Sequence, residues 1–231
     1  MGLPLRYRLP VENIFCYTET TLHFKVKKPF DNKRMIVYNK SMRRKDENKK
    51  EAIFKATKEL LNEIGFADIS MSKIAKRAGV SAATIYVYFE NKDDMLKKLY
   101  LDVKRNLFRA LQAVLDDAQP VRYAVEQAMR SYLAFIMENK ADYLFLEQFS
   151  NSPMLQNLCI EEELPSFGSL FVIIEKGKRE GLLRPVDDYL ILHYCYLPIS
   201  QLAKEQMKGN AQISEESIQT VIDMSWNAIR A

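Results

Sequence analysis

Residues 78–92 read AGVSAATIYVYFENK, and this short stretch decides the fold. Gly79 can take the left-handed conformation that ends a helix, and Ser81 is a favourable N-cap for the next one. The stretch therefore predicts a helix, a tight turn and a second short helix, which together form a helix-turn-helix. Because any corner between two helices gives a similar pattern, the side chains of the second helix have to distinguish the motif.

The front of this second helix carries only small side chains, from Ser81 to Thr84. A recognition helix brings its first turn close to base edges in the major groove, so bulky residues there would hold the backbone away. Ser81 and Thr84 can form hydrogen bonds, while Ala82, Ala83 and the threonine methyl can contact thymine methyl groups. We therefore expect these four residues to read the bases of double-stranded DNA.

The back of the same helix is aromatic. Tyr86, Val87 and Tyr88 follow one turn later, where phenolic hydroxyls could bind phosphates and fix the position of the helix without reading sequence. Ile85 and Phe89 are better placed as core anchors beneath the motif. The alternative is that the whole run is core, but three aromatic residues within four positions cannot all face inward on one helix.

Charge supports a polyanionic partner for the front of the chain. Lys92 opens the next predicted helix, where exposed N–H groups and the helix dipole already favour a phosphate. The formal charge is +5 for residues 1–41, +6 for residues 42–110 and −7 for residues 111–231. This asymmetry indicates that only the front meets a polyanion, although an ordinary solvated surface gives similar counts.

The composition argues against several other classes of protein. The 231-residue chain is 48% hydrophobic, as in a globular protein, and has no apolar run of about 18 residues that could span a membrane. Two arginines and two prolines among the first ten residues do not fit a signal peptide, so we expect a cytoplasmic protein. Cys16, Cys159 and Cys195 are an odd number without CxxC spacing, so we expect no disulfide framework, no metal site and no cofactor.

From Asp46 onward the pattern is helical. One face of a first helix, which Gly65 ends, carries Ile53, Thr57, Leu60, Leu61 and Ile64. Ser70 can cap a second helix, whose inward face carries Met71, Ile74, Ala75 and Ala78. Later helices are predicted over residues 92–115, 121–139, 141–150, 164–181, 187–208 and 214–229. The expected fold class is all-α.

Residues 1–41 do not follow this helical pattern. Leu22, Phe24 and Val26 alternate with polar residues, as in a strand, and RMIVYN at residues 34–39 is a second short apolar run. A lone hairpin is marginally stable. Two other interpretations stay open, a flexible basic arm and upstream sequence translated ahead of a start at Met35 or Met42.

Residues 47–92 resemble the DNA-binding domain of the tetracycline-repressor (TetR) family. The matching stretches are AIFKATKELLNEIGFADIS, MSKIAKRAGVS and ATIYVYFENKDDML, and KGKREGLLRP at residues 176–185 resembles the family's close of helix seven. The family typically shows a serine cap, then Thr-Leu-Tyr, an aromatic-Phe pair and a lysine that opens helix four. It often has Lys or Arg and then Gly where this chain has Ala82 and Ala83, which leaves base contacts there apolar or absent.

The resemblance implies an N-terminal three-helix helix-turn-helix domain, which we expect at residues 45–92, after the basic extension of residues 1–44. It also implies a larger helical ligand-binding and dimerisation domain at residues 93–231. The family is homodimeric, so the resemblance also implies a homodimer. This homodimer would bind a two-fold operator, act as a repressor and be released from DNA by a small molecule. On matching positions the DNA contacts fall on Ser70, Ser81, Ala82, Ala83, Thr84, Tyr86, Val87, Tyr88 and Lys92.

The C-terminal half is dense in aromatic and methionine side chains between Tyr123 and Tyr196. Most of them must be core, but apolar cavities with a few polar groups are also how lipophilic ligands are held. We therefore predict a hydrophobic, aromatic small-molecule effector. The predicted lining residues are Tyr132, Phe135, Phe171 and His193.

The last two predicted helices suit a dimer interface. Residues 189–202 are apolar on nearly every face, which requires cover from a core and from a partner, and Pro198 should kink or break that helix. Residues 214–229 carry a stripe that contains Trp226, for which a place in the core is the alternative. By resemblance these helices form the two-fold interface.

An enzyme fits the sequence poorly. There are only two histidines, and His193 and Cys195 are two positions apart, so they face different sides of a helix. No Gly-rich phosphate loop and no metal-ligand spacing is found. A DNA-binding protein without an inducer, either architectural or partner-recruiting, stays open as the alternative function.

Overall fold

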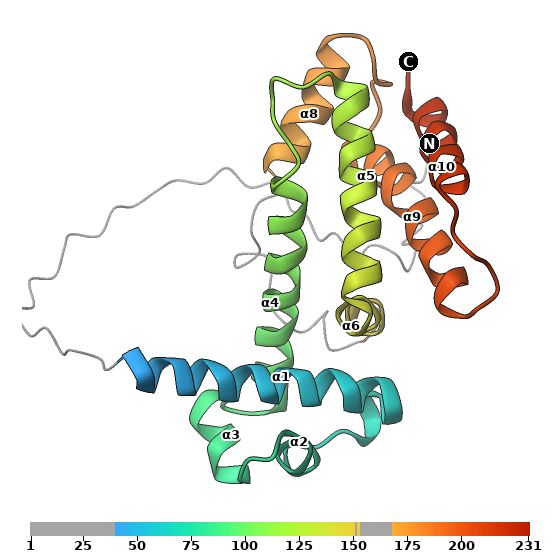
Figure 1. Cartoon of the computed structure of the whole chain (residues 1–231). Coiled ribbons are helices and arrows are strands. Elements are labelled where there is room, and N and C mark those ends of the chain that lie inside the picture. Colours follow the sequence, from blue (N-terminus) through green and yellow to red (C-terminus); the bar gives the residue numbers. More distant parts are fainter. Residues whose placement is uncertain (1–39, 151, 153–167) are drawn as a thin grey trace, which may run out of the picture. The chain divides into compact units, whose positions relative to one another are not determined.

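The computed structural model describes residues 40–150, 152 and 168–231 (Figure 1). The predicted hairpin of residues 22–39, Cys16, Cys159 and the start of the helix predicted at residues 164–181 lie outside these residues. Every named element in the described part is a helix, so the all-α prediction is confirmed. The helices are α1 (Lys40–Asp68), α2 (Met71–Ala78), α3 (Ala82–Tyr88), α4 (Lys92–Gln112), α5 (Val121–Glu138), α6 (Lys140–Ser150), α8 (Gly168–Arg179), α9 (Asp188–Met207) and α10 (Glu215–Ile229).

The described residues form two compact units. The first, which we call the reader unit, contains residues 40–100, 144–150 and 152, and the C-terminal unit contains residues 101–143 and 168–231. The division falls inside α4 and inside α6, so both helices run from one unit into the other. No helix in the described part of the chain is long and apolar enough to cross a membrane.

In the reader unit, α1 begins earlier than predicted, and Gly65 interrupts it where the sequence predicted its end. The helix begins at Lys40, before the first apolar residue of its buried face, and Gly65 interrupts it with φ 73° and ψ 177°. Of the residues predicted to share one face of this helix, Ile53 and Leu61 are buried, whereas Ile64 is 36% exposed.

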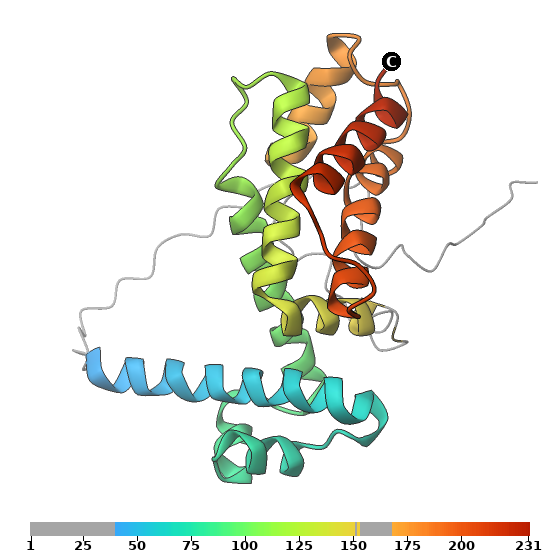
Figure 2. The same cartoon turned by 45° about the vertical axis from the view of Figure 1, so that its right-hand side comes forward.

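The C-terminal unit is built on α5, α9 and α10 (Figure 2). The sequence predicted a kink or a break at Pro198. The break is wrong, because α9 continues through this residue. A proline removes one backbone hydrogen bond, and the buried Tyr196, Ile199 and Ala203 hold the turns on both sides of it in the core.

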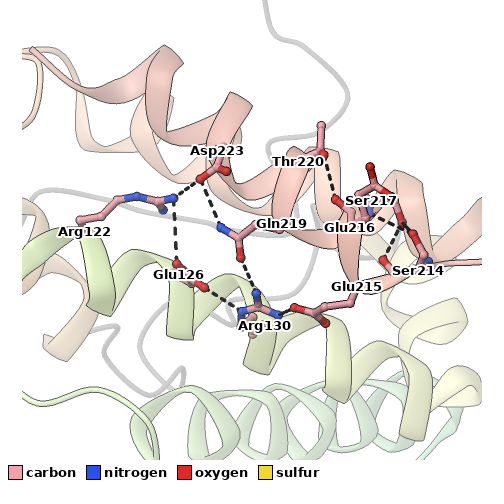
Figure 3. Close-up of polar contacts among 10 residues, drawn as sticks. All are labelled: Arg122, Glu126, Arg130, Ser214, Glu215, Glu216, Ser217, Gln219, Thr220 and Asp223. Atoms are coloured by element: carbon pink, nitrogen blue, oxygen red, sulfur yellow. Dashed lines mark hydrogen bonds and ion pairs between the residues drawn. The ribbon is translucent and has the colours of Figure 1, made fainter.

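Polar side chains join α5 to α10 (Figure 3). The guanidinium of Arg130 donates to Glu126 at 2.9 Å and to Gln219 at 2.6 Å, and it forms an ion pair with Glu215 at 2.7 Å. About two turns earlier on α5, Arg122 pairs with Asp223 and lies 5.2 Å from the ring centre of Trp226. The half-buried Trp226 therefore contacts α5 of its own chain.

Candidate nucleic-acid interface

Capping hydrogen bonds build the corner between α2 and α3. Ser70 accepts from the backbone N–H of Lys73 at 3.3 Å, and Ser81 accepts from the N–H of Thr84 at 3.1 Å. Between them Gly79 has φ 69° and ψ 28°, the left-handed conformation that ends α2, and its N–H bonds to the Lys76 carbonyl at 3.4 Å. The predicted caps and turn are confirmed, and together they make a helix-turn-helix.

Two residues anchor α3 in the core. Ile85 is fully buried and Phe89 is 1% exposed, with its ring centre 5.6 Å from that of Phe54 on α1. Since successive residues of a helix point about 100° apart, these anchors fix which side of α3 faces outward. The predicted roles of Ile85 and Phe89 as core anchors are confirmed.

The outward side of α3 carries most of the residues predicted to contact DNA. Ser81, Ala82 and Ala83 are exposed at its front, and Tyr86 and Val87 are 57% and 77% exposed behind them. The structure thus brings a small-residue tip and a phenol together on one accessible face.

Thr84 is half-buried at the edge of this face. Its hydroxyl lies 2.8 Å from that of Ser81, close enough for a hydrogen bond between them. A hydroxyl can donate one bond and accept two, so both groups keep capacity for a base edge.

Tyr88 has a partner that the sequence did not reveal. Its hydroxyl donates to the carboxylate of Asp46 at 2.9 Å, a contact between residues 42 positions apart that ties α3 to α1. Desolvation and then the bond to Asp46 raise the pKa of the Tyr88 phenol. Since the single O–H of Tyr88 is engaged, it can donate to a phosphate only if the Asp46 bond breaks.

The two remaining predicted contacts lie at helix starts. Ser70 is exposed at the N-cap of α2, and Lys92 is the first residue of α4, half-buried, with its ammonium 3.5 Å from the Phe66 carbonyl. Lys73 and Lys76 are also exposed on α2 and were not singled out from the sequence. Their spacing of three places them on one side of a helix, which is the signal that could have found them.

An ion pair holds the corner against α1. Arg77 of α2 donates two hydrogen bonds to Glu63, at 2.7 and 2.6 Å. The hydrogen bond from Arg77 is the main cause that lowers the pKa of the Glu63 carboxyl. Such a two-bond contact fixes the orientation of the guanidinium as well as its distance.

The residues predicted to bind an effector lie in the C-terminal unit. Tyr132 and Phe135 are buried on α5, whereas Phe171 on α8 and His193 on α9 are half-buried. Tyr132 and His193 both approach Tyr196, with ring centres 6.3 and 5.2 Å away. The structure therefore brings two of the four together around a third aromatic ring.

Neither a metal centre nor an activated thiol is found among the described residues. No three His, Cys, Asp or Glu side chains there are grouped so that they could hold a metal ion. Desolvation raises the pKa of the Cys195 thiol to about 12, although part of that residue is exposed. A thiol with so high a pKa is a poor nucleophile at neutral pH.

A buried anchor face, capped helix ends and an exposed small-residue tip on α3 define a helix-turn-helix protein of the DNA-binding class. The family model of bacterial regulatory proteins, tetR family, matches residues 53–99. The model of the tetracyclin repressor-like C-terminal domain matches residues 122–230. The chain belongs to the TetR family and is a DNA-binding transcription regulator, not an enzyme.

Individual relatives agree with this assignment. An uncharacterized HTH-type transcriptional regulator of Haemophilus influenzae is 27% identical over 180 residues, which are 78% of this chain and 95% of the relative. The HTH-type transcriptional regulator BetI of Escherichia coli is 32% identical over 130 residues, 48% of this chain and 67% of BetI. The solved structure of a TetR family regulator from Marinobacter aquaeolei VT8 has a TM-score of 0.72 and 26% identity, covering 82% of this chain and 99% of that one.

Proposed function

We propose that this regulator is a repressor that binds a two-fold operator as a homodimer and is released by a hydrophobic small molecule. The observation that carries the DNA part is the outward face of α3, where Ser81–Ala83, Tyr86 and Val87 are exposed while Ile85 and Phe89 are buried. The small tip enters the major groove and reads base edges. Tyr86 and Lys92 bind phosphates and set the position of α3 on the duplex.

Exposed apolar side chains on α9 and α10 support the homodimer. Leu190 and Tyr194 are 52% and 53% exposed and are four positions apart on α9, so they share one side of that helix. Met224 on α10 is 67% exposed. α9 and α10 also pack on each other, so a second copy that covers these residues would bury apolar side chains of both helices.

The dimer part is tested by sedimentation at several protein concentrations. The double variant Leu190→Glu and Tyr194→Glu is expected to sediment as a monomer at concentrations where the wild type is a dimer. Its control is Leu182→Glu, which changes another exposed leucine of the C-terminal unit and should leave the dimer intact. A monomeric wild-type protein that still binds a two-fold site as two independent copies would contradict this part.

Aromatic groups on α5 and α9 support the effector. Tyr132, His193 and Tyr196 supply apolar ring surface together with polar atoms, which is the chemistry of sites for aromatic ligands. The Nδ1 atom of His193 lies 2.6 Å from the Tyr189 carbonyl, so its other ring nitrogen remains for a ligand hydroxyl. Phe135 and Phe171 would line the same site.

The helix α4 runs from the reader unit into the C-terminal unit and would carry the signal between them. The dimer would have two states, and in one of them the two α3 helices are spaced wrongly for the operator. An effector that binds this state more tightly shifts the dimer toward it, by no more than the difference between its affinities for the two states. The test is thermal melting of the protein with a panel of planar aromatic compounds, since binding to the folded state raises the melting temperature. A compound that raises it should also release operator DNA, and one that stabilises the protein but leaves DNA binding unchanged would contradict the mechanism.

A further inference from the structure

A hydrogen bond in the reader unit engages a side chain next to the proposed DNA-binding face. The hydroxyl of Tyr88, the last residue of α3, donates to the carboxylate of Asp46 on α1 at 2.9 Å. Tyr88 directly follows Tyr86 and Val87, which are exposed on the outward side of α3. The family resemblance assigns a DNA contact to Tyr88 as well. This one hydroxyl therefore has a partner within the chain and an expected partner on DNA.

The two partners are alike in chemistry. The Asp46 carboxylate and a DNA phosphate both present anionic oxygens that accept charge-assisted hydrogen bonds. A phenol has a single O–H to donate, so Tyr88 can donate fully to one of them but not to both. The bond to Asp46 has to break before Tyr88 can bind a phosphate, and the new bond then replaces one of similar kind.

The backbone of Tyr88 is held in place within the reader unit. Phe89, which follows it, is 1% exposed and anchors the end of α3. The ammonium of Lys98 on α4 donates to the Tyr88 carbonyl at 3.3 Å, and it also donates to the carboxylate of Asp94 at 2.8 Å. Because α3 is fixed at this point, the pair separates most easily by movement of Asp46.

Asp46 lies on a part of α1 that is weakly held. Residues 46–49 are all exposed, and Ile53 is the first buried residue among those described on this helix. Segments with few buried apolar contacts open at a low cost in free energy. The carboxylate can therefore move away, by rotation of its side chain or by a shift of this turn, while α3 stays anchored.

Charge gives a second reason to consider Asp46 a competitor of DNA. Residues 46–52 contain the acidic Asp46, Glu47 and Glu51 against Lys49 and Lys50, so this stretch is not cationic. A carboxylate beside a phosphate-binding surface repels a polyanion and lowers the affinity for it. Direct attraction of DNA is therefore not what Asp46 contributes.

We infer that Asp46 mimics a phosphate: it occupies the hydroxyl of Tyr88 in the DNA-free protein and yields it to a DNA phosphate when the operator binds. The pair is an autoinhibitory contact. It lowers the affinity for every DNA sequence, because Asp46 competes with the DNA backbone and not with the bases. This inference rests on the proposed operator binding and adds a control on its strength. A bond that served only to position α3 would have the opposite effect, since its loss would weaken DNA binding.

The experiment measures the affinity of the full-length protein for a selected operator and for an unrelated duplex. Asp46→Asn keeps the size of the side chain but removes its charge. It should tighten binding to both duplexes by about fivefold, the equivalent of one hydrogen bond at an exposed site. Asp46→Ala, which has no acceptor, should give at least that gain. The matched control is Glu51→Gln, which removes the same charge from an exposed position of the same helix and should give a clearly smaller gain.

A double-mutant cycle separates competition for the hydroxyl from simple repulsion. Tyr88→Phe alone should cost little affinity, because it removes the donor from both the free and the bound protein. In the Tyr88→Phe background, Asp46→Asn should lose most of its gain, whereas repulsion between Asp46 and DNA would leave the gain intact. Melting temperatures check that each variant is folded.

NMR of isotopically labelled tyrosine gives a readout that does not depend on affinity. The Tyr88 signal is the one absent from the spectrum of Tyr88→Phe. In the free proteins it should differ between the wild type and Asp46→Asn. In the operator complexes the two signals should become similar, because a phosphate is then the acceptor in both.

Four results would each overturn the inference. They are an affinity that Asp46→Asn leaves unchanged or lowers, an equal gain from Glu51→Gln, a gain that persists without the Tyr88 hydroxyl, and a wild-type Tyr88 signal that does not change when the operator is added. Specific operator binding with any of these results overturns only this inference. If the wild type binds no duplex specifically, the proposed function fails and this inference fails with it.

Discussion

The outward face of α3 and the apolar face of α9 and α10 are both exposed in the described part of the chain, but their chemistry differs. At α3 the exposed residues are Ser81, Ala82, Ala83, Tyr86 and Val87, in a part of the chain, residues 42–110, with a formal charge of +6. At α9 and α10 they are large and apolar, with Leu190 and Met224 as examples, in an acidic half of the chain. The first combination suits a hydrated polyanion and the second suits another protein surface.

The comparison also shows how each face is supported. α3 is short, and Ile85 and Phe89 hold it from beneath, so its accessible side is set by local periodicity and two anchors. The α10 helix is held from the side by the contacts of Arg130 on α5 with Glu215 and Gln219. A substitution beneath α3 should therefore abolish DNA binding by the reader unit. A substitution at Arg130 should instead weaken formation of the dimer.

Ile85→Ala gives the largest expected effect. Removal of a fully buried side chain from so small a unit should cost about 2–5 kcal/mol and abolish binding to every DNA sequence. Hydrogen exchange should show reduced protection in residues 46–100 while α5 and α9 stay protected. Val87→Ala, on the exposed side of the same helix, is the control and should leave the melting temperature nearly unchanged; equal effects from the two would refute the assignment of the two faces.

Arg130→Ala should weaken the C-terminal unit by about 1–2 kcal/mol, because hydrogen bonds to charged groups are involved and the site is only partly exposed. Partial burial lowers the pKa of Arg130, and the carboxylates of Glu126 and Glu215 raise it with a net increase, which agrees with a stabilising contact. Denaturant unfolding measures the effect. DNA binding should be recovered at high protein concentration, and a loss that concentration does not repair would show that Arg130 acts elsewhere.

Tyr86→Phe should weaken binding to all DNA sequences by about fivefold, the effect of removing one hydrogen bond of about 1 kcal/mol. The hydroxyl is on a side chain that is 57% exposed, so the folded state should keep its melting temperature. Titration of one strong and one weak operator measures this. A loss confined to one operator would mean that Tyr86 reads bases.

Glu63→Ala should give the smallest effect, a slight decrease in melting temperature at pH 7. The pKa of Glu63 is lowered in the folded state by the hydrogen bond from Arg77, so its contribution is present above the ordinary value of 4.5 and disappears as the pH falls through the lower folded value. Wild type and variant should melt together once the pH is well below the folded pKa. Glu51→Ala, an exposed acidic residue on the same helix, is the control.

Local features of the site could be predicted from the sequence, because neighbouring residues determine them. Four such features depend on interactions between residues a few positions apart. They are the caps at Ser70 and Ser81, the left-handed conformation of Gly79 and the inward orientation of Ile85. The structure confirms all four, and the family resemblance at the same residues agrees with the matched family model.

The features that were missed depend on contacts far apart in sequence or on context. The bond between Asp46 and Tyr88 joins residues 42 positions apart, and nothing in either local stretch indicates it. The start of α1 at Lys40 has no apolar periodicity to mark it. A kink or a break was expected at Pro198, and α9 does not break there, because tertiary packing outweighs the loss of one backbone bond.

Selection of bound DNA from a random pool tests the central claim most directly, namely that the tip of α3 reads bases while its aromatic end holds phosphates. The wild type should enrich a two-fold symmetric site whose half-site centres lie about 34 Å apart or a multiple of that distance. Thr84→Ala should keep this spacing and change the preferred base at one position in each half-site. An unchanged preference for Thr84→Ala, or enrichment of no symmetric site by the wild type, would contradict the account.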